Sequence, residues 1–118
     1  MQGKYRLALE EIADHYGFIN QREQLYEEMG ELIVALNKLR RSTEDRENIV
    51  DCPYINVVYG NVVTELADVE IMTEQIKYLL DCEGDVDSEK IRKINRQLHI
   101  VNQEKVEKIK KGMVVNEK

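Results

Sequence analysis

The chain has 118 residues, one proline, six glycines and a formal net charge of −6. This length predicts one domain with a modest core, and the scarcity of helix breakers predicts a mostly helical fold. The acidic balance disfavours a general nucleic-acid binder, and no apolar run approaches the roughly 20 residues that span a bilayer. Since the N-terminus lacks a signal-like stretch and Cys52 and Cys82 form no CxxC motif, we expect a soluble cytoplasmic protein with reduced thiols.

The first two expected elements are helices separated by a glycine. The first covers about residues 5–15 and ends at Gly17, because glycine is the favoured residue just past a helix C-terminus. The second begins near Asn20, a good cap residue, and runs to about Arg41. Its apolar side chains keep helical spacing and form one stripe: Leu25, Met29, Leu32, Leu36 and Leu39.

A polar connection over residues 42–53 leads into the second half of the chain. Residues 54–59 are β-branched and aromatic, so they are compatible with a short strand or with an early helical turn. A third helix is expected over about residues 61–80, with an apolar face formed by Val62, Leu66, Val69, Ile76 and Leu80.

A fourth helix is expected after a loop that begins at Asp81. The cap of this helix is either Asp87 or Ser88, and the helix continues to about Lys110 before the chain end frays. We therefore expect a single all-α domain over residues 1–118, with a core over about 5–110 and a tail over about 111–118.

Acidic residues at helical spacing on the second and third expected helices carry the strongest chemical signal. Glu27, Glu28 and Glu31 fall on the second helix, and Glu65 and Asp68 on the third. On a helical wheel Glu28 and Glu31 flank the apolar stripe, whereas Glu27 lies further round. Glu65 falls inside the apolar sector, where an isolated carboxylate would lose its hydration at a high cost. Glu65 therefore needs a cation, a proton or a basic partner.

If these two helices face each other, their carboxylates converge. Two carboxylates about 5 Å apart repel by roughly 3 kcal/mol at an effective dielectric constant near 20. A divalent ion turns this repulsion into coordination, and Mg²⁺ is the ion usually bound through carboxylates together with substrate phosphates. The alternative is a solvated acidic surface, which is common on Glu-rich helices.

Further polar residues lie on the same flank, namely Asn20, Gln24, Lys38 and Asn61. An amide that reads a base and a lysine that binds phosphate are suited to these positions, although amides and lysines occur on any helix surface.

The pattern Glu27-Glu28-x-x-Glu31 followed by Glu65-x-x-Asp68 resembles the EExxE…ExxD signature of the MazG-like, all-α nucleoside triphosphate pyrophosphatases. The similarity extends to the surrounding segments and covers about residues 5–110. The interval between the two motifs is longer than is usual in this family, which leaves the role of the connection over residues 42–59 open.

The resemblance implies a four-helix, MazG-like bundle that is completed by assembly into a homodimer or homotetramer. It implies that Glu28, Glu31, Glu65 and Asp68 bind Mg²⁺, with Mn²⁺ as a substitute ion, and that Glu27 lies beside the ligands or on the surface. The implied reaction splits an NTP or dNTP between its α- and β-phosphates into a monophosphate and pyrophosphate.

Within the implied reaction, Glu31 is our first candidate for the general base and Glu28 the second. Gln24, Lys38 and Asn61 are the candidates for substrate binding, with Lys38 placed to offset charge on the leaving pyrophosphate. The preferred base and sugar depend on a pocket shape that the spacing of residues does not give.

Parts of the sequence suggest three alternative functions. A helical nucleotide-binding or interaction module without turnover is the main one, and nucleotide binding without hydrolysis would identify it. A di-iron bundle normally uses ExxH pairs, whereas neither acidic motif contains a histidine and His15 and His99 are isolated. An EF-hand over residues 81–92 fails because glycine stands at its fourth position and Arg92 replaces the bidentate glutamate.

Overall fold

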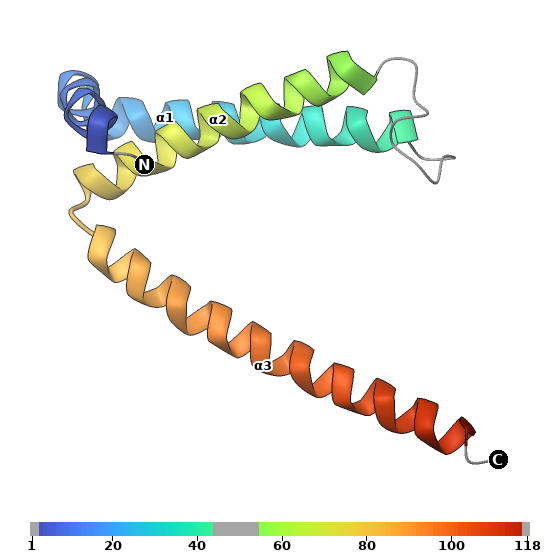
Figure 1. Ribbon diagram of the computed structural model, residues 1–118. Coiled ribbons are helices and arrows are strands. Elements are labelled where there is room, and N and C mark those ends of the chain that lie inside the picture. Colours follow the sequence, from blue (N-terminus) through green and yellow to red (C-terminus); the bar gives the residue numbers. More distant parts are fainter. Residues whose placement is uncertain (1–2, 44–54, 117–118) are drawn as a thin grey trace. The chain divides into compact units, whose positions relative to one another are not determined.

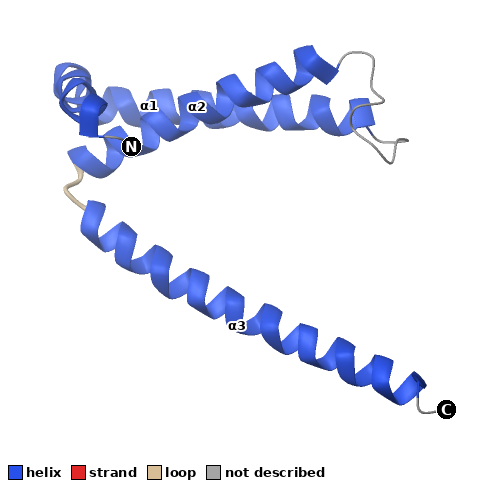
Figure 2. Ribbon diagram, in the orientation of Figure 1, coloured by secondary structure: helices blue, strands red, loops and turns tan. Residues whose placement is uncertain are grey.

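The computed structural model describes residues 3–43 and 55–116, and within these ranges the chain forms three helices and no strand (Figures 1 and 2). The helices are α1 (Gly3–Thr43), α2 (Ile55–Leu79) and α3 (Glu83–Asn116). The predicted all-α class is confirmed, while the four-helix, MazG-like bundle stays a prediction. The chain divides into two compact units, Met1–Asp81 and Cys82–Lys118, which are described separately below.

Helix α1 consists of two helical segments that meet at Gly17. Gly17 has a φ of 82° and a ψ of 167°, in a region that residues with a Cβ rarely adopt. In Figure 1 the N-terminal segment is seen nearly end-on, whereas the rest of α1 runs across the view. The break at this glycine was therefore predicted correctly, and it redirects the chain after the first segment.

The predicted helix cap at Asn20 is wrong. The second segment resumes directly after Gly17, so Asn20 lies inside the helix. Its side-chain Nδ2 donates a hydrogen bond to the backbone carbonyl of Tyr16, at 2.8 Å. Asn20 thus satisfies a carbonyl at the end of the first segment, where helix geometry leaves acceptors without an intrahelical donor.

Helices α1 and α2 lie side by side and antiparallel, and they form the core of the first unit (Figure 1). The core is thin, and its buried apolar side chains are Leu9, Ala13, Ala35, Val62 and Met72. A layer of two helices covers only one side of each apolar stripe. Members of the predicted stripes therefore remain exposed, including Met29 at 47%, Leu36 at 44% and Leu66 at 43%.

Two polar contacts fix how α1 and α2 are aligned. Inside the core, Gln21 Nε2 donates to Gln75 Oε1 at 2.6 Å, and both side chains are buried. Towards the end of α2, the Tyr78 hydroxyl donates to Asp14 Oδ2 at 2.7 Å. Because a buried amide without its partner is costly, the glutamine pair disfavours any sliding of one helix along the other.

The ambiguous segment before the third expected helix is helical where it is described. Helix α2 begins at Ile55, which is earlier than the expected start near Asn61. Tyr54, Cys52 and most of the predicted polar connection lie outside the described residues.

The connection between α2 and α3 is shorter than expected. Asp81 adopts a left-handed backbone conformation with a φ of 50°, and the backbone N–H of Val86 donates to the carbonyl of Cys82 at 2.9 Å. Helix α3 therefore starts at Glu83, and the predicted cap at Asp87 or Ser88 is wrong because both residues lie inside the helix. The helix also continues beyond the predicted end at Lys110, to Asn116.

The second unit consists of α3 over its described length. Cys82, at the start of this unit, is a half-buried free thiol. None of the helices in the described ranges is both long enough and apolar enough to cross a membrane.

Candidate metal site

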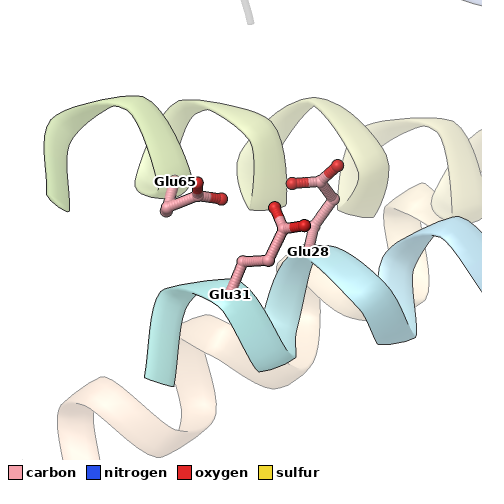
Figure 3. A group of neighbouring side chains, drawn as sticks. All are labelled: Glu28, Glu31 and Glu65. Atoms are coloured by element: carbon pink, nitrogen blue, oxygen red, sulfur yellow. The ribbon is translucent and has the colours of Figure 1, made fainter. Parts of the chain in front are cut away.

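Three of the four predicted metal ligands converge between α1 and α2. Glu28 and Glu31 project from α1 and Glu65 projects towards them from α2 (Figure 3). Each of the three offers a carboxylate oxygen, and these oxygens all lie within 4.8 Å of one another. The spacing of three residues places Glu28 and Glu31 on neighbouring positions of one helix surface, and the antiparallel packing of α2 brings Glu65 opposite them.

Two of these carboxylates contain a buried oxygen that lacks a hydrogen-bond partner. Glu28 and Glu65 are half-buried, and in each the Oε2 atom is inaccessible to solvent and receives no hydrogen bond. The other oxygen of Glu28 accepts a hydrogen bond from Gln24 Nε2 at 2.8 Å. Buried polar atoms without partners are rare because they lose hydration without compensation. A bound cation would satisfy both orphaned oxygens at once.

Glu31 is the most accessible of the three carboxylates and carries the largest electrostatic perturbation. Partial loss of hydration contributes most, and the nearby charges of Glu28 and Glu65 add to it, so the pKa of Glu31 rises from 4.5 to about 6. A proton shared with Glu65 and the charge of Glu27 contribute further to this rise in pKa. Without a cation, the site therefore retains a proton more readily than an ordinary glutamate does.

The fourth predicted ligand, Asp68, lies next to Glu28 but outside the group of three. Loss of hydration raises the pKa of Asp68, and the charge of Glu28 together with a proton shared between the two carboxyl groups raises it further. Asp68 therefore belongs to the same acidic neighbourhood, and it borders the site on the side of Glu28.

The donor set suits a hard divalent cation. Carboxylate oxygens are the ligands preferred by Mg²⁺, Mn²⁺ and Ca²⁺, whereas Zn²⁺ and Cu²⁺ sites usually contain histidine or cysteine. The three converging residues supply oxygen ligands only. Three protein ligands leave positions in an octahedral shell for water or phosphate oxygens, so the residues present fit a Mg²⁺ ion that also contacts a ligand.

A pocket of about 520 Å³ adjoins two of the three carboxylates, Glu31 and Glu65, and is open to solvent. Its lining combines the acidic residues with two of the predicted substrate-binding residues, and comprises Glu27, Gly30, Glu31, Val34, Ala35, Lys38, Asn61 and Glu65. This volume is within the range typical of small-molecule sites, about 300–1,000 Å³. Lys38 and Asn61 therefore border the same pocket as Glu31 and Glu65, from opposite helices.

Gln24 lies beside Glu28, and Glu27 lies on the wall of the pocket. Gln24, a predicted substrate-binding residue, does not line this pocket, and its side chain donates a hydrogen bond to Glu28. Glu27 is exposed, lines the pocket and raises the pKa of Glu31. The sequence does contain a signal for the Gln24 contact, since residues four apart on a helix are surface neighbours.

Gly30 is a pocket residue that was not among the predicted site residues. It lies within α1 on the pocket wall, and a Cβ built there would meet nothing within 4 Å. A glycine in the middle of a helix lowers stability relative to alanine and suggests a packing or functional reason. Its absent side chain leaves room in the pocket next to Glu31.

No protein-family model matches the chain, and comparisons with curated proteins and with solved structures find no match. The resemblance to the MazG-like pyrophosphatases therefore rests on the acidic motifs and their surrounding residues alone.

Proposed function

We propose that this protein is a Mg²⁺-dependent nucleoside triphosphate pyrophosphohydrolase, which converts an NTP or dNTP into the monophosphate and pyrophosphate. The observation that carries the proposal is the convergence of Glu28, Glu31 and Glu65 within 4.8 Å, with two buried oxygens lacking hydrogen-bond partners. The choice of reaction comes from the MazG-like motif, since a carboxylate site alone does not specify a reaction.

Glu28, Glu31 and Glu65 are the residues that would hold the ion, with Asp68 as a further carboxylate beside Glu28. When bound, Mg²⁺ neutralises charge on phosphate oxygens and lowers the pKa of a coordinated water. Gln24 keeps one oxygen of Glu28 occupied by a hydrogen bond, which leaves the other oxygen for the ion. Because Gln24 holds one of its two oxygens, the Glu28 carboxylate is restricted in its orientation.

Glu31 is the better placed general base. It is exposed and borders the pocket, whereas Glu28 is half-buried and accepts a hydrogen bond from Gln24. In the proposed step, a water oxygen forms a bond to the α-phosphorus and Glu31 takes the proton. The bond between the α-phosphorus and the bridging oxygen breaks, and its electron pair leaves with the pyrophosphate.

Lys38 and Asn61 would bind the substrate within the pocket. The ammonium group of Lys38 offsets charge on the departing pyrophosphate, and the Asn61 amide forms hydrogen bonds with the sugar or base. The thin core of the first unit favours assembly into a homodimer or homotetramer, in which a second chain would cover apolar surface that one chain leaves exposed.

Pyrophosphate release from a panel of nucleoside triphosphates, measured with Mg²⁺ and with EDTA, tests this proposal. The wild type should release pyrophosphate only with Mg²⁺, and Glu65→Gln should lose this activity. Glu70→Gln is the matched control, because it makes the same chemical change on an exposed part of α2.

Release of orthophosphate would move the cleaved bond and contradict the proposed reaction. Mg²⁺-dependent nucleotide binding without turnover would instead support the helical binding module.

A further inference from the structure

Helix α3 carries an apolar stripe that its own unit leaves open. Ile91, Ile94, Leu98 and Val101 follow the alternating spacing of three and four residues that is typical of a coiled-coil seam, and their side chains are 63%, 60%, 53% and 42% exposed. The described part of the second unit is this one helix (Figure 1), and a single helix has no second surface with which to cover its own stripe. The second unit by itself therefore cannot cover this stripe.

Charges beyond the ends of the stripe differ in sign. Continuing the same spacing towards the N-terminus reaches Asp87, and continuing it towards the C-terminus reaches Lys105. Beside the seam, Lys90 precedes the first apolar position and Glu104 follows the last one. At its N-terminal end the apolar stripe thus has Asp87 in line with it and Lys90 beside it. At its C-terminal end it has Lys105 in line with it and Glu104 beside it.

This arrangement is self-complementary only when two copies run in opposite directions. If Ile91 packs on Val101 of a second copy, and Ile94 on its Leu98, then each Lys105 lies opposite the Asp87 of the other copy. Flanking charges are the usual determinants of partner choice and orientation in such pairs.

The same antiparallel register also matches the charges beside the seam. It places Lys90 next to Glu104 of the second copy, at both ends of the contact. A parallel pair in register would instead oppose Lys105 to Lys105 and Asp87 to Asp87, which is unfavourable on both sides.

We propose that α3 binds the α3 helix of a second copy of the chain, antiparallel and centred near residue 96. The contact buries the apolar stripe of both copies and closes on itself as a two-fold symmetric dimer. The proposal does not depend on the metal site, because none of the acidic residues of α1 and α2 takes part in the pairing.

Charge reversal at the ends of the apolar stripe tests the proposal in the chain of 118 residues. Sedimentation velocity over a wide range of concentration should show self-association of the wild type. Lys105→Asp and Asp87→Lys should each raise the dissociation constant about tenfold, because each places like charges opposite one another twice. The double variant, in which the two charges are exchanged, should restore the wild-type value.

Two further variants control for helix formation and for the seam itself. Lys110→Asp makes the same charge change on the outer side of the helix and should leave self-association unchanged. Leu98→Glu should abolish the contact, while circular dichroism confirms that the helix content is retained. A wild-type chain that stays monomeric would show that the stripe is covered in another way and would overturn the proposal. Failure of the double variant to restore association would overturn the antiparallel register.

Discussion

Replacement of Glu65 by glutamine should stabilise the metal-free protein and at the same time remove its stabilisation by Mg²⁺. In the wild type, Glu65 and Glu28 are both half-buried, and their oxygens lie within 4.8 Å. Glutamine has nearly the same shape, carries no charge and can donate a hydrogen bond to the orphaned oxygen of Glu28. The substitution therefore relieves the repulsion that the cation would otherwise neutralise.

The size of the effect follows from the separation of these two groups. At 4.8 Å, the upper limit of the distance between their converging oxygens, two unit charges repel by about 3.5 kcal/mol at an effective dielectric constant of 20 and by about 0.9 kcal/mol in bulk water. Because Glu28 and Glu65 are only half-buried, solvent screening reduces the expected gain to about 1–2 kcal/mol. For a domain of about 100 residues, this gain raises the melting temperature by roughly 4–8 °C.

Thermal denaturation followed by circular dichroism in EDTA and in excess Mg²⁺ measures both effects. Wild type should melt higher with Mg²⁺, since a ligand that binds only the folded state stabilises it. Glu65→Gln should melt higher than wild type in EDTA and should respond little to Mg²⁺, whereas the control Glu70→Gln should behave as wild type. A Glu65→Gln protein that is destabilised in EDTA, or that keeps the full response to Mg²⁺, would refute the reasoning.

Three other predictions concern the same site. Gln24→Met keeps the length of the side chain but removes the donor to Glu28, so Mg²⁺ affinity measured by calorimetry should fall about tenfold; an unchanged affinity would show that the hydrogen bond does not orient the ligand. Gly30→Ala should stabilise the helix by about 0.8–1.0 kcal/mol in chemical denaturation, while the added methyl group raises KM for the nucleotide; an unchanged KM would place the substrate elsewhere. Because the pKa of Glu31 is raised from 4.5 to about 6, its contribution to the stability of the metal-free protein is present below pH 4.5 and is lost as the pH rises through 6. Mg²⁺ affinity should increase over the same interval as the ion displaces the proton, and a flat calorimetric profile there would contradict the assignment.

Most of the acidic site could be predicted from the sequence, because helix geometry determines which carboxylates share a surface. The three-residue spacing determines that Glu28 and Glu31 share a surface, and the apolar pattern of the third expected helix turns Glu65 inwards. The exact position of Asp68 could not be predicted in this way. Its distance from the other carboxylates depends on how α2 is rotated against α1, and this rotation is set by packing between residues far apart in sequence, such as Gln21 and Gln75.

Helix boundaries were harder to predict than the site. A favourable cap residue typically contributes about 1 kcal/mol to stability. This contribution is too small to end a helix when the residues on both sides of the cap also favour helix. Asn20 and Asp87 both lie inside helices for this reason, whereas Gly17 marks a true break because its positive φ excludes ordinary helical backbone. Gly17 was therefore a more reliable signal in α1 than Asn20.

The central claim is that Glu28, Glu31 and Glu65 form a divalent-cation site, and Mn²⁺ binding followed by electron paramagnetic resonance tests it most directly. As Mn²⁺ is added to the protein, the signal of the free ion should be suppressed until the site is filled, and added Mg²⁺ should restore it by competition. Glu65→Gln should lose this binding, and Glu70→Gln should retain it. Equal Mn²⁺ binding by wild type and Glu65→Gln, or no binding by either protein, would contradict the account.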